Sequence, residues 1–167
     1  MYIIAETPRL IIREFLPTEE ETYLNHFNDE EVCLHLPKRT RDERIKIFFV
    51  ALANYTDNKQ SGIWGMFDKT NGSFIGSCLL RPYNNEPDKL EIGYSMDKIY
   101  WGKGIGTEMA IAMVEHGFAN PNIKAIIGVT TFENVASQKV LENAGLTQVD
   151  NVIREGLELA CFRLERT

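Results

Sequence analysis

The sequence contains few of the residues that mark disulfide-stabilised, metal-binding or membrane-spanning proteins. It has only three cysteines and three histidines, and no two cysteines show the two-residue spacing of zinc and redox motifs. No apolar run reaches the roughly 20 residues of a membrane-spanning helix. The first residues also lack the basic and then apolar order of a signal peptide. We therefore expect reduced thiols, no bound metal, no membrane association and a cytoplasmic location.

Positive charge is also in the minority. Lysine and arginine number 18 against 24 aspartates and glutamates, which gives a formal net charge of −6. This balance argues against a general nucleic-acid-binding protein. It favours a cationic or amine-bearing partner through long-range steering, although solubility alone explains the same charge. A length of 167 residues with 44% hydrophobic residues fits one domain over residues 1–167, as a monomer or a homodimer.

Glycine is concentrated in one short stretch. Gly102, Gly104 and Gly106 stand where a strand-like run over 90–96 gives way to a helical run over 104–118. Glycine permits a positive φ and close approach to the backbone. The first N–H groups of a helix lack intrahelical acceptors and carry the positive end of the helix dipole. The stretch therefore predicts an anion site suited to a pyrophosphate.

The spacing of these glycines excludes two common phosphate-binding loops. The Walker A loop requires a lysine directly after its last glycine, whereas Thr107 follows Gly106. The dinucleotide fingerprint requires Gly-x-Gly-x-x-Gly, but its last position here is Thr107 or Met109. A bare Gly-x-Gly-x-Gly run is also compatible with a tight strand-to-helix turn that binds nothing, so the glycines alone do not decide the function.

The hydrophobic periodicity predicts a mixed α/β fold. Strands are expected over residues 7–13, 63–68, 73–81, 89–96, 124–131, 148–154 and 157–165, and helices over 18–27, 30–36, 42–55, 104–118 and 134–144. The strand before the glycine-rich stretch, the helix after it and the next strand form a β-α-β unit, which should be parallel and right-handed. The other strands follow short turns and should pair antiparallel. We expect a mixed, mostly antiparallel central sheet flanked by helices.

Several boundaries follow from local signals. Thr18, with Glu21 three residues later, predicts a capping box at a helix start. Asp42 is expected to cap the longest N-terminal helix, whose buried apolar stripe should include Phe49. Residues 82–88, rich in proline and asparagine, are expected to form a loop.

Four motifs in order along the chain resemble one protein family. Trp101-Gly-Lys-Gly-Ile-Gly resembles the Q/R-x-x-G-x-G/A loop of the GCN5-related N-acetyltransferases (GNAT). Tryptophan at the first position is common in their ribosomal-protein, or RimJ/RimL-like, branch. Residues 7–13 resemble the T-x-R-L-x-L-R opening of that branch, and Glu91-Ile-Gly-Tyr resembles its E-I-G-Y strand. Residues 134–146 resemble its N-x-x-S-x-x-x-L-E-x-x-G-F stretch, with Leu146 in place of phenylalanine.

The resemblance implies an N-acetyltransferase that uses acetyl-CoA and lets an amine attack the thioester directly, without a metal. It implies cofactor contacts from Met96, Trp101, Gly102, Lys103, Gly104, Ile105, Gly106, Thr107, Asn134 and Lys139. Backbone N–H groups of the loop should bind the diphosphate, and those near Met96 should polarise the thioester carbonyl. Asn134 should contact pantetheine, although it is equally suited to cap a helix. Lys103 and Lys139 should reach phosphates, although both fit ordinary surface charges.

The resemblance also implies two side chains that carry the chemistry. Glu91 is the candidate general base, because only a neutral amine attacks a thioester and a carboxylate desolvated in a cleft has a raised pKa. Its alternatives are an ion-pair partner or a solvent-facing residue. Ser137 shares a helix face with Asn134 and should donate a hydrogen bond to the departing thiolate, unless it is an ordinary polar residue. Tyr94 and Tyr100 are alternative donors to the sulfur.

Two other functions fit the same residues. One is a non-catalytic acyl-CoA-binding or sensor domain on the same fold, and the other is a nucleotide-binding domain of another class. The acceptor of an acetyltransferase also stays open among a protein N-terminus, a lysine, a polyamine, an amino sugar and a small amino-acid derivative, because one fold hosts many acceptors.

Overall fold

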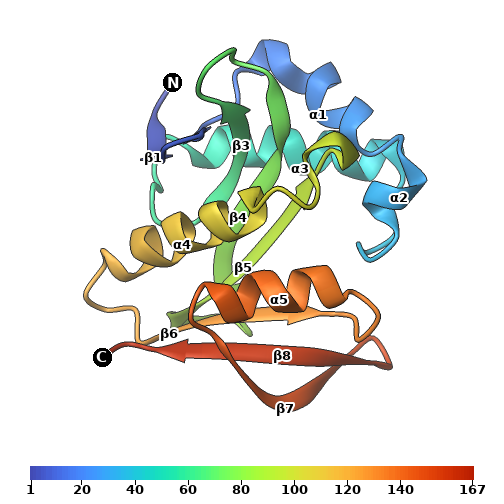
Figure 1. Ribbon diagram of the computed structural model, residues 1–167. Coiled ribbons are helices and arrows are strands. Elements are labelled where there is room, and N and C mark those ends of the chain that lie inside the picture. The colour runs from blue at the N-terminus through green and yellow to red at the C-terminus, as the bar shows by residue number, and fades with distance from the viewer.

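The computed structural model describes residues 1–167, and its centre is one open sheet of eight strands (Figure 1). In their order across the sheet, the strands are β1 (Ile3–Glu6), β2 (Leu10–Arg13), β3 (Gly62–Asp68), β4 (Phe74–Tyr83), β5 (Glu86–Met96), β6 (Ala125–Thr130), β8 (Leu157–Glu165) and β7 (Thr147–Arg154). Neighbouring strands run antiparallel except β5 and β6, which run parallel. The predicted mixed, mostly antiparallel sheet is confirmed.

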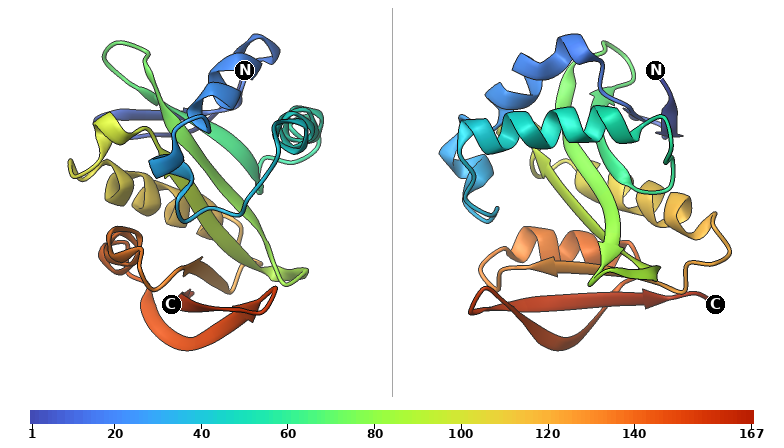
Figure 2. Two further views of the ribbon diagram at one scale, coloured as in Figure 1. Left: turned by 90° about the vertical axis from the view of Figure 1, so that its right-hand side faces the viewer. Right: turned by 180° about the vertical axis from the view of Figure 1, so that it is seen from behind.

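Helices cover both faces of this sheet. They are α1 (Glu20–His26), α2 (Glu30–Cys33), α3 (Arg41–Asn54), α4 (Ile105–Phe118) and α5 (Val135–Asn143). Helices α1 and α3 lie on one face, which we call the α1 face, and α4 and α5 lie on the other, the α4 face (Figure 2). None of these helices has both the length and the apolar character needed to cross a membrane.

Alternation along β5 assigns its side chains to the two faces. A Cβ on Gly117 of α4 would lie 2.8 Å from Ile126 and 3.4 Å from Leu90, so these apolar side chains lie under α4. Side chains at every second position of a strand share a face. The even-numbered residues of β5 therefore face α4, whereas Glu91 and Ser95 face α1.

The parallel pairing of β5 with β6 ends before either strand does. The ladder stops at Ile92 and Gly128, although β5 continues to Met96. On its other edge β5 stays paired with β4, and the N–H of Asp97 donates to a β4 carbonyl at 2.8 Å. Successive strand residues direct their N–H and C=O groups to opposite edges. Tyr94 and Met96 therefore direct theirs into the gap where β5 and β6 part.

The start of α1 differs from the prediction. Residues 17–19 form a turn of 3-10 helix, and Thr18 caps nothing. The carboxylate of Glu19 instead accepts the N–H of Leu16 at 2.8 Å. The predicted capping box of Thr18 and Glu21 is wrong, because the reciprocal side chain lies two residues earlier than expected.

The start of α3 is also displaced. Thr40 caps this helix and accepts the N–H of Glu43 at 3.2 Å, while the Glu43 carboxylate accepts the Thr40 N–H at 2.7 Å. Asp42 lies inside the first turn, so its predicted role as the cap is wrong. Phe49, predicted to be buried, is 46% exposed, because the buried stripe of α3 passes through Phe48 instead.

Two strands, β4 and β5, extend beyond their predicted limits, and a third, β1, was not predicted. Residues 82–88 are not a loop, because β4 and β5 continue into a tight hairpin at Asn84 and Asn85. Both asparagines have positive φ, 49° and 59°, which asparagine tolerates better than most residues and which a type I′ turn requires. Strand β1 was not predicted, and it pairs with β2 at the edge of the sheet.

Candidate active site

The glycine-rich stretch between β5 and α4 leaves a row of backbone N–H groups without protein partners. Gly104 is the N-cap of α4, and both Gly102 and Gly104 have positive φ, 71° and 76°. None of the N–H groups of residues 102–107 donates a hydrogen bond within the protein. They stand at the positive end of the α4 dipole. This arrangement has the donors that bind an anion at a helix N-terminus.

The N-terminal hairpin braces this loop through Glu108. Its carboxylate accepts the Thr7 hydroxyl at 2.6 Å and the Arg9 backbone N–H at 2.9 Å, and it pairs with the Arg9 side chain at 2.7 Å. The Arg9 guanidinium also donates to the carbonyl of Lys103 at 2.8 Å. Burial raises the pKa of Glu108, but its bonds to Thr7 and Arg9 outweigh burial and hold the pKa below its usual range. The first hairpin and the glycine-rich loop therefore form one unit.

Arg9→Ala removes this brace. We expect the free energy of unfolding to fall by about 1 kcal/mol, because an exposed ion pair and the hydrogen bond to Lys103 are lost. The affinity for coenzyme A, the ligand that the resemblance implies, should fall several-fold, because the loop is no longer held. Lys69→Ala is the control, since Lys69 pairs with exposed Glu6 at 2.9 Å and donates to the carbonyl of Thr7 at 3.3 Å, and neither partner belongs to the glycine-rich loop. Urea unfolding and calorimetric titration measure both effects, and equal coenzyme A affinities in the two variants would contradict the brace.

Trp101 ties the glycine-rich loop to the end of β5. Its indole N–H donates to the carbonyl of Met96 at 2.9 Å. The Met96 N–H, directed into the gap between β5 and β6, remains available. A carbonyl bound in this gap would therefore meet the N–H of Met96 and the backbone groups of Tyr94.

The first turn of α5 meets β5 beside the same gap. Asn134 is the N-cap, as predicted, and its side chain accepts the N–H of Ser137 at 3.1 Å. Burial raises the pKa of the Tyr94 phenol, and a hydrogen bond with the Ser137 side chain opposes this only in part. Two hydroxyl groups, one from β5 and one from α5, therefore lie together at the gap.

The two predicted phosphate-binding lysines are exposed and loosely placed. Lys103 lies 5.9 Å from the ring centre of Tyr100, and Lys139 lies 3.9 Å from the carboxylate of Glu142. Neither contact restrains the ammonium group. Both side chains can move toward a bound phosphate, but the backbone N–H groups provide the fixed part of the site.

Glu91 lies on the α1 face of β5, where two arginines hold it. The residue is 5% exposed. Arg154 at the end of β7 donates to both carboxylate oxygens, and Arg81 on β4 donates at 2.6 Å. Burial raises the pKa of Glu91, but the bonds and charges of Arg154 and Arg81 outweigh burial and hold the pKa below its usual range. The expectation of a raised pKa is wrong, because Glu91 is an ion-pair partner of both arginines; its predicted role as general base stays a prediction.

The α1 face carries further polar contacts that sequence reasoning missed. His26 of α1 contacts Ser95 and Asp97 at the end of β5. His35, between α2 and α3, lies 2.8 Å from the hydroxyl of Thr131 just after β6. The only sequence signal was alternation, which places Ser95 on the same face as Glu91. The partners come from segments that are distant in sequence, so no local pattern pairs them.

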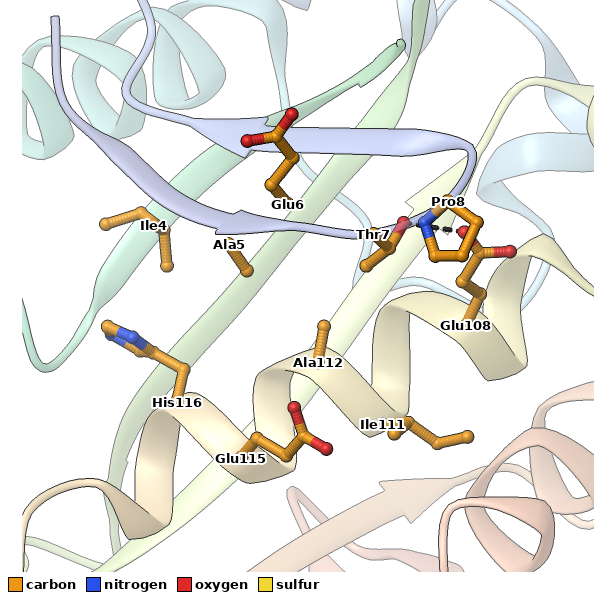
Figure 3. A pocket seen from close by; sticks show the side chains of 10 residues that line it. All are labelled: Ile4, Ala5, Glu6, Thr7, Pro8, Glu108, Ile111, Ala112, Glu115 and His116. Carbon is orange, nitrogen blue, oxygen red and sulfur yellow. Dashed lines mark hydrogen bonds between the residues drawn. The ribbon is translucent and has the colours of Figure 1, made fainter.

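A cavity of about 490 Å³ lies between β1 and α4, away from the glycine-rich loop (Figure 3). It is lined by Ile4, Ala5, Glu6, Thr7, Pro8, Glu108, Ile111, Ala112, Glu115 and His116. The bond between Thr7 and Glu108 closes one end of it. None of the predicted cofactor-binding residues lines this cavity.

The cysteines are all free thiols, and burial raises the pKa of the Cys78 thiol. No group of three or more histidine, cysteine, aspartate and glutamate side chains lies close enough together to hold a metal ion.

Comparisons with known proteins agree with this architecture. The acetyltransferase (GNAT) domain family matches residues 9–147. YnaD of Bacillus subtilis, an uncharacterised N-acetyltransferase, is 28% identical over 156 residues, which cover 93% of this chain and 86% of YnaD. RimL, a ribosomal L7/L12 α-N-protein acetyltransferase solved with coenzyme A, has a TM-score of 0.81 at 16% identity, over 98% of both chains. The ribosomal-protein-S5-alanine acetyltransferase of Vibrio fischeri has a TM-score of 0.81 at 18% identity, over 96% of this chain and 95% of that one. At these identities the solved structures show a shared fold, and the family match shows that the chain belongs to the GNAT family of N-acetyltransferases.

Proposed function

We propose that the protein transfers an acetyl group from acetyl-CoA to a primary amine, by direct attack of the amine on the thioester. One observation carries this proposal. The unpaired N–H groups of residues 102–107 and the β5 groups at the parted strands lie along one path. That path suits a diphosphate at one end and an amide-bearing arm with a thioester at the other.

In this proposal, different parts of the path bind different parts of acetyl-CoA. The loop N–H groups bind the diphosphate, aided by the mobile Lys103 and Lys139. Tyr94 offers backbone groups to pantetheine, together with the side chain of Asn134. The N–H of Met96 polarises the thioester carbonyl and stabilises the charge that develops on its oxygen. Ser137, next to the Tyr94 phenol, donates to the departing thiolate.

The α1 face supplies the route for the acceptor. The diphosphate site, at the N-terminus of α4, lies on the opposite face, so donor and acceptor would enter from different sides. The solved relatives described as ribosomal-protein acetyltransferases favour a protein or peptide amine and a place in the RimJ/RimL-like branch. Net charge −6 favours a cationic acceptor as well. We therefore place a peptide N-terminal amine first among the acceptors to be tested.

Thermal unfolding with ligands tests the binding half of the proposal. Acetyl-CoA at 100 times its Kd should stabilise the protein by about 2.7 kcal/mol, whereas ATP and NAD should not. Gly104→Val should lose this stabilisation, because a branched side chain strains the N-cap conformation at φ 76°. Gly72→Val is the matched control: Gly72 has φ 74° in the β3–β4 turn, outside the glycine-rich loop, and a Cβ there would meet no atom within 4 Å. Without ligand, Gly72→Val should lose about as much stability as Gly104→Val, but acetyl-CoA should still stabilise it.

Release of free coenzyme A tests the catalytic half. The panel contains a peptide N-terminal amine, a lysine side chain, a polyamine, an amino sugar and a small amino-acid derivative. Turnover with at least one of them supports the enzyme. Tight acetyl-CoA binding without turnover on any amine would support the non-catalytic sensor instead, and stabilisation by ATP or NAD alone would contradict the assignment.

A further inference from the structure

A buried chain of three polar groups runs from the end of β5 to the surface. Ser95 Oγ lies 2.8 Å from Nε2 of His26, and Nδ1 of the same ring contacts Oδ1 of Asp97. The imidazole is wholly buried, whereas the side chain of Asp97 is 36% exposed. We propose that these groups form a proton relay, in which Ser95 takes the proton of the acceptor amine and passes it to His26. The relay rests on the proposed acetyl transfer and supplies a base other than Glu91.

The partners of His26 determine which nitrogen accepts. The carboxylate of Asp97 can only accept a hydrogen bond, so Nδ1 carries the hydrogen. The neutral ring then offers the lone pair of Nε2 to the Ser95 hydroxyl. Burial lowers the pKa of His26, and Asp97 opposes this only in part; Arg44 also lowers the pKa, and Asp29 raises it. The ring therefore stays neutral near pH 7 and can receive a proton.

The ring is also held in one orientation by aromatic neighbours. Phe27 and Phe74 pack edge-on against the His26 imidazole, with ring centres 4.8 Å and 5.5 Å away. With both nitrogens hydrogen-bonded as well, the imidazole has little freedom to turn. A base that is fixed in this way accepts a proton along one direction only, through the hydroxyl of Ser95.

Ser95 stands on the α1 face at the end of β5, beside the gap proposed to hold the thioester, and is 9% exposed. It lies between Tyr94 and Met96, whose backbone groups border the gap between β5 and β6. Gly93, two residues earlier on the same face, has no side chain of its own, and the side chain of Leu79 covers it. Glu91, the next residue on that face, is already bound by two arginines. Ser95 is therefore the hydroxyl on the α1 face of β5 that lies next to the gap, and we assign the contact with the acceptor amine to it.

The proton transfer balances within the direct mechanism. The amine nitrogen forms a bond to the acyl carbon and becomes positively charged in the tetrahedral intermediate. Its proton moves to Ser95 Oγ while the proton of Ser95 moves to Nε2 of His26, and Asp97 stabilises the resulting imidazolium. The carbon–sulfur bond then breaks, and the electron pair leaves with the thiolate. The imidazolium then returns the proton from Nε2 through Ser95 Oγ to the thiolate or to solvent, so that Nδ1 keeps its hydrogen for the next turnover.

Three variants test the relay. Ser95→Ala removes the relay hydroxyl, and His26→Asn keeps an N–H donor for Asp97 but removes the base. Both should lower kcat/KM for the best acceptor 100-fold or more, with acetyl-CoA affinity within twofold of wild type. Ser95→Thr keeps a hydroxyl and should restore most of the rate. Ser77→Ala is the matched control, because Ser77 lies directly across from Ser95 on β4, is 7% exposed and makes no hydrogen bond to His26.

The pH profile separates the relay from a purely structural contact between α1 and β5. Wild-type kcat/KM should fall at acid pH as His26 becomes protonated, at a pKa below the ordinary value for histidine. This break should vanish in Ser95→Ala and His26→Asn, whereas a structural role would lower the rate at every pH and leave the break in place.

Each remaining outcome decides the proposal. Turnover by wild type with an unchanged rate and profile in Ser95→Ala would overturn the relay but not the acetyltransferase. A wild-type protein that binds acetyl-CoA and acetylates no amine would overturn both. Detection of acetylated Ser95 by mass spectrometry would also overturn the relay, because Ser95 would then be a nucleophile.

Discussion

Gly76→Ala is expected to lower the free energy of unfolding by about 3 kcal/mol or more, because the added methyl group overlaps backbone. A Cβ at Gly76 would lie 2.1 Å from the carbonyl oxygen of Ser95 and 2.8 Å from Cα of Met96. Both atoms belong to the main chain of β5, so no side-chain rotation relieves the overlap. Strands β4 and β5 must separate where β5 directs Tyr94 and Met96 into the gap.

Urea unfolding measures this effect, and Gly93→Ala is its control. A Cβ at Gly93 would contact only side-chain atoms of Leu79, at 3.2–3.5 Å. That side chain can move, so the control should change stability by less than about 1 kcal/mol. The surviving folded fraction of Gly76→Ala should also bind acetyl-CoA weakly. A wild-type unfolding midpoint in Gly76→Ala would contradict the close approach of β4 to β5.

Glu91→Gln is expected to lower the free energy of unfolding by about 2–3 kcal/mol. Breaking a buried ion pair costs about 3–5 kcal/mol, but the side chains of Arg81 and Arg154 are 56% and 34% exposed, so water recovers part of the loss. Glutamine matches the size of glutamate and removes only its charge. Glu21→Gln is the control, because Glu21 and Arg41 form an exposed pair that should contribute less than about 0.5 kcal/mol.

The stability that Glu91 contributes should decrease at acid pH. The folded pKa of Glu91 is lowered, so the carboxylate stabilises the fold above its unfolded pKa of about 4.3. That contribution is lost as the pH falls through the folded pKa. The difference in the free energy of unfolding between wild type and Glu91→Gln, measured in urea from pH 7 to pH 3, should be constant above about pH 5 and become smaller below it. A rate profile that loses its acid break in Glu91→Gln would instead return Glu91 to the role of base.

Local patterns predicted the part of the fold that holds the cofactor path. Three glycines at a strand-to-helix junction predicted the start of α4, and the apolar runs on either side of this helix predicted the parallel pair of β5 and β6. Asn134 was predicted as a cap, and the structure confirms it. These signals lie within a few residues of the elements they describe, so periodicity and capping chemistry are sufficient to find them.

The parts that could not be predicted depend on partners that are far apart in the sequence. Glu91 is an isolated carboxylate in its strand, and Arg154 lies 63 residues away. The relay joins His26 to residues about 70 positions later. Nothing near Arg9 indicates Glu108, 99 residues away. The local sequence around Glu91 does not reveal its arginine partners, so the carboxylate is interpreted as a desolvated base. Its pKa is therefore expected to rise, whereas the arginines lower it.

Because β5 and β6 part before β5 ends, backbone groups in the middle of the sheet lack a neighbouring strand. An acyl donor lying there would occupy the place of a missing strand and hydrogen-bond to Tyr94 and Met96 as a neighbouring peptide would. The amide groups of the pantetheine arm can imitate such a peptide, whereas a short thioester without them cannot. The donor would then be selected by main-chain hydrogen bonds to its pantetheine arm, as a neighbouring strand is, rather than by contacts with its acyl group.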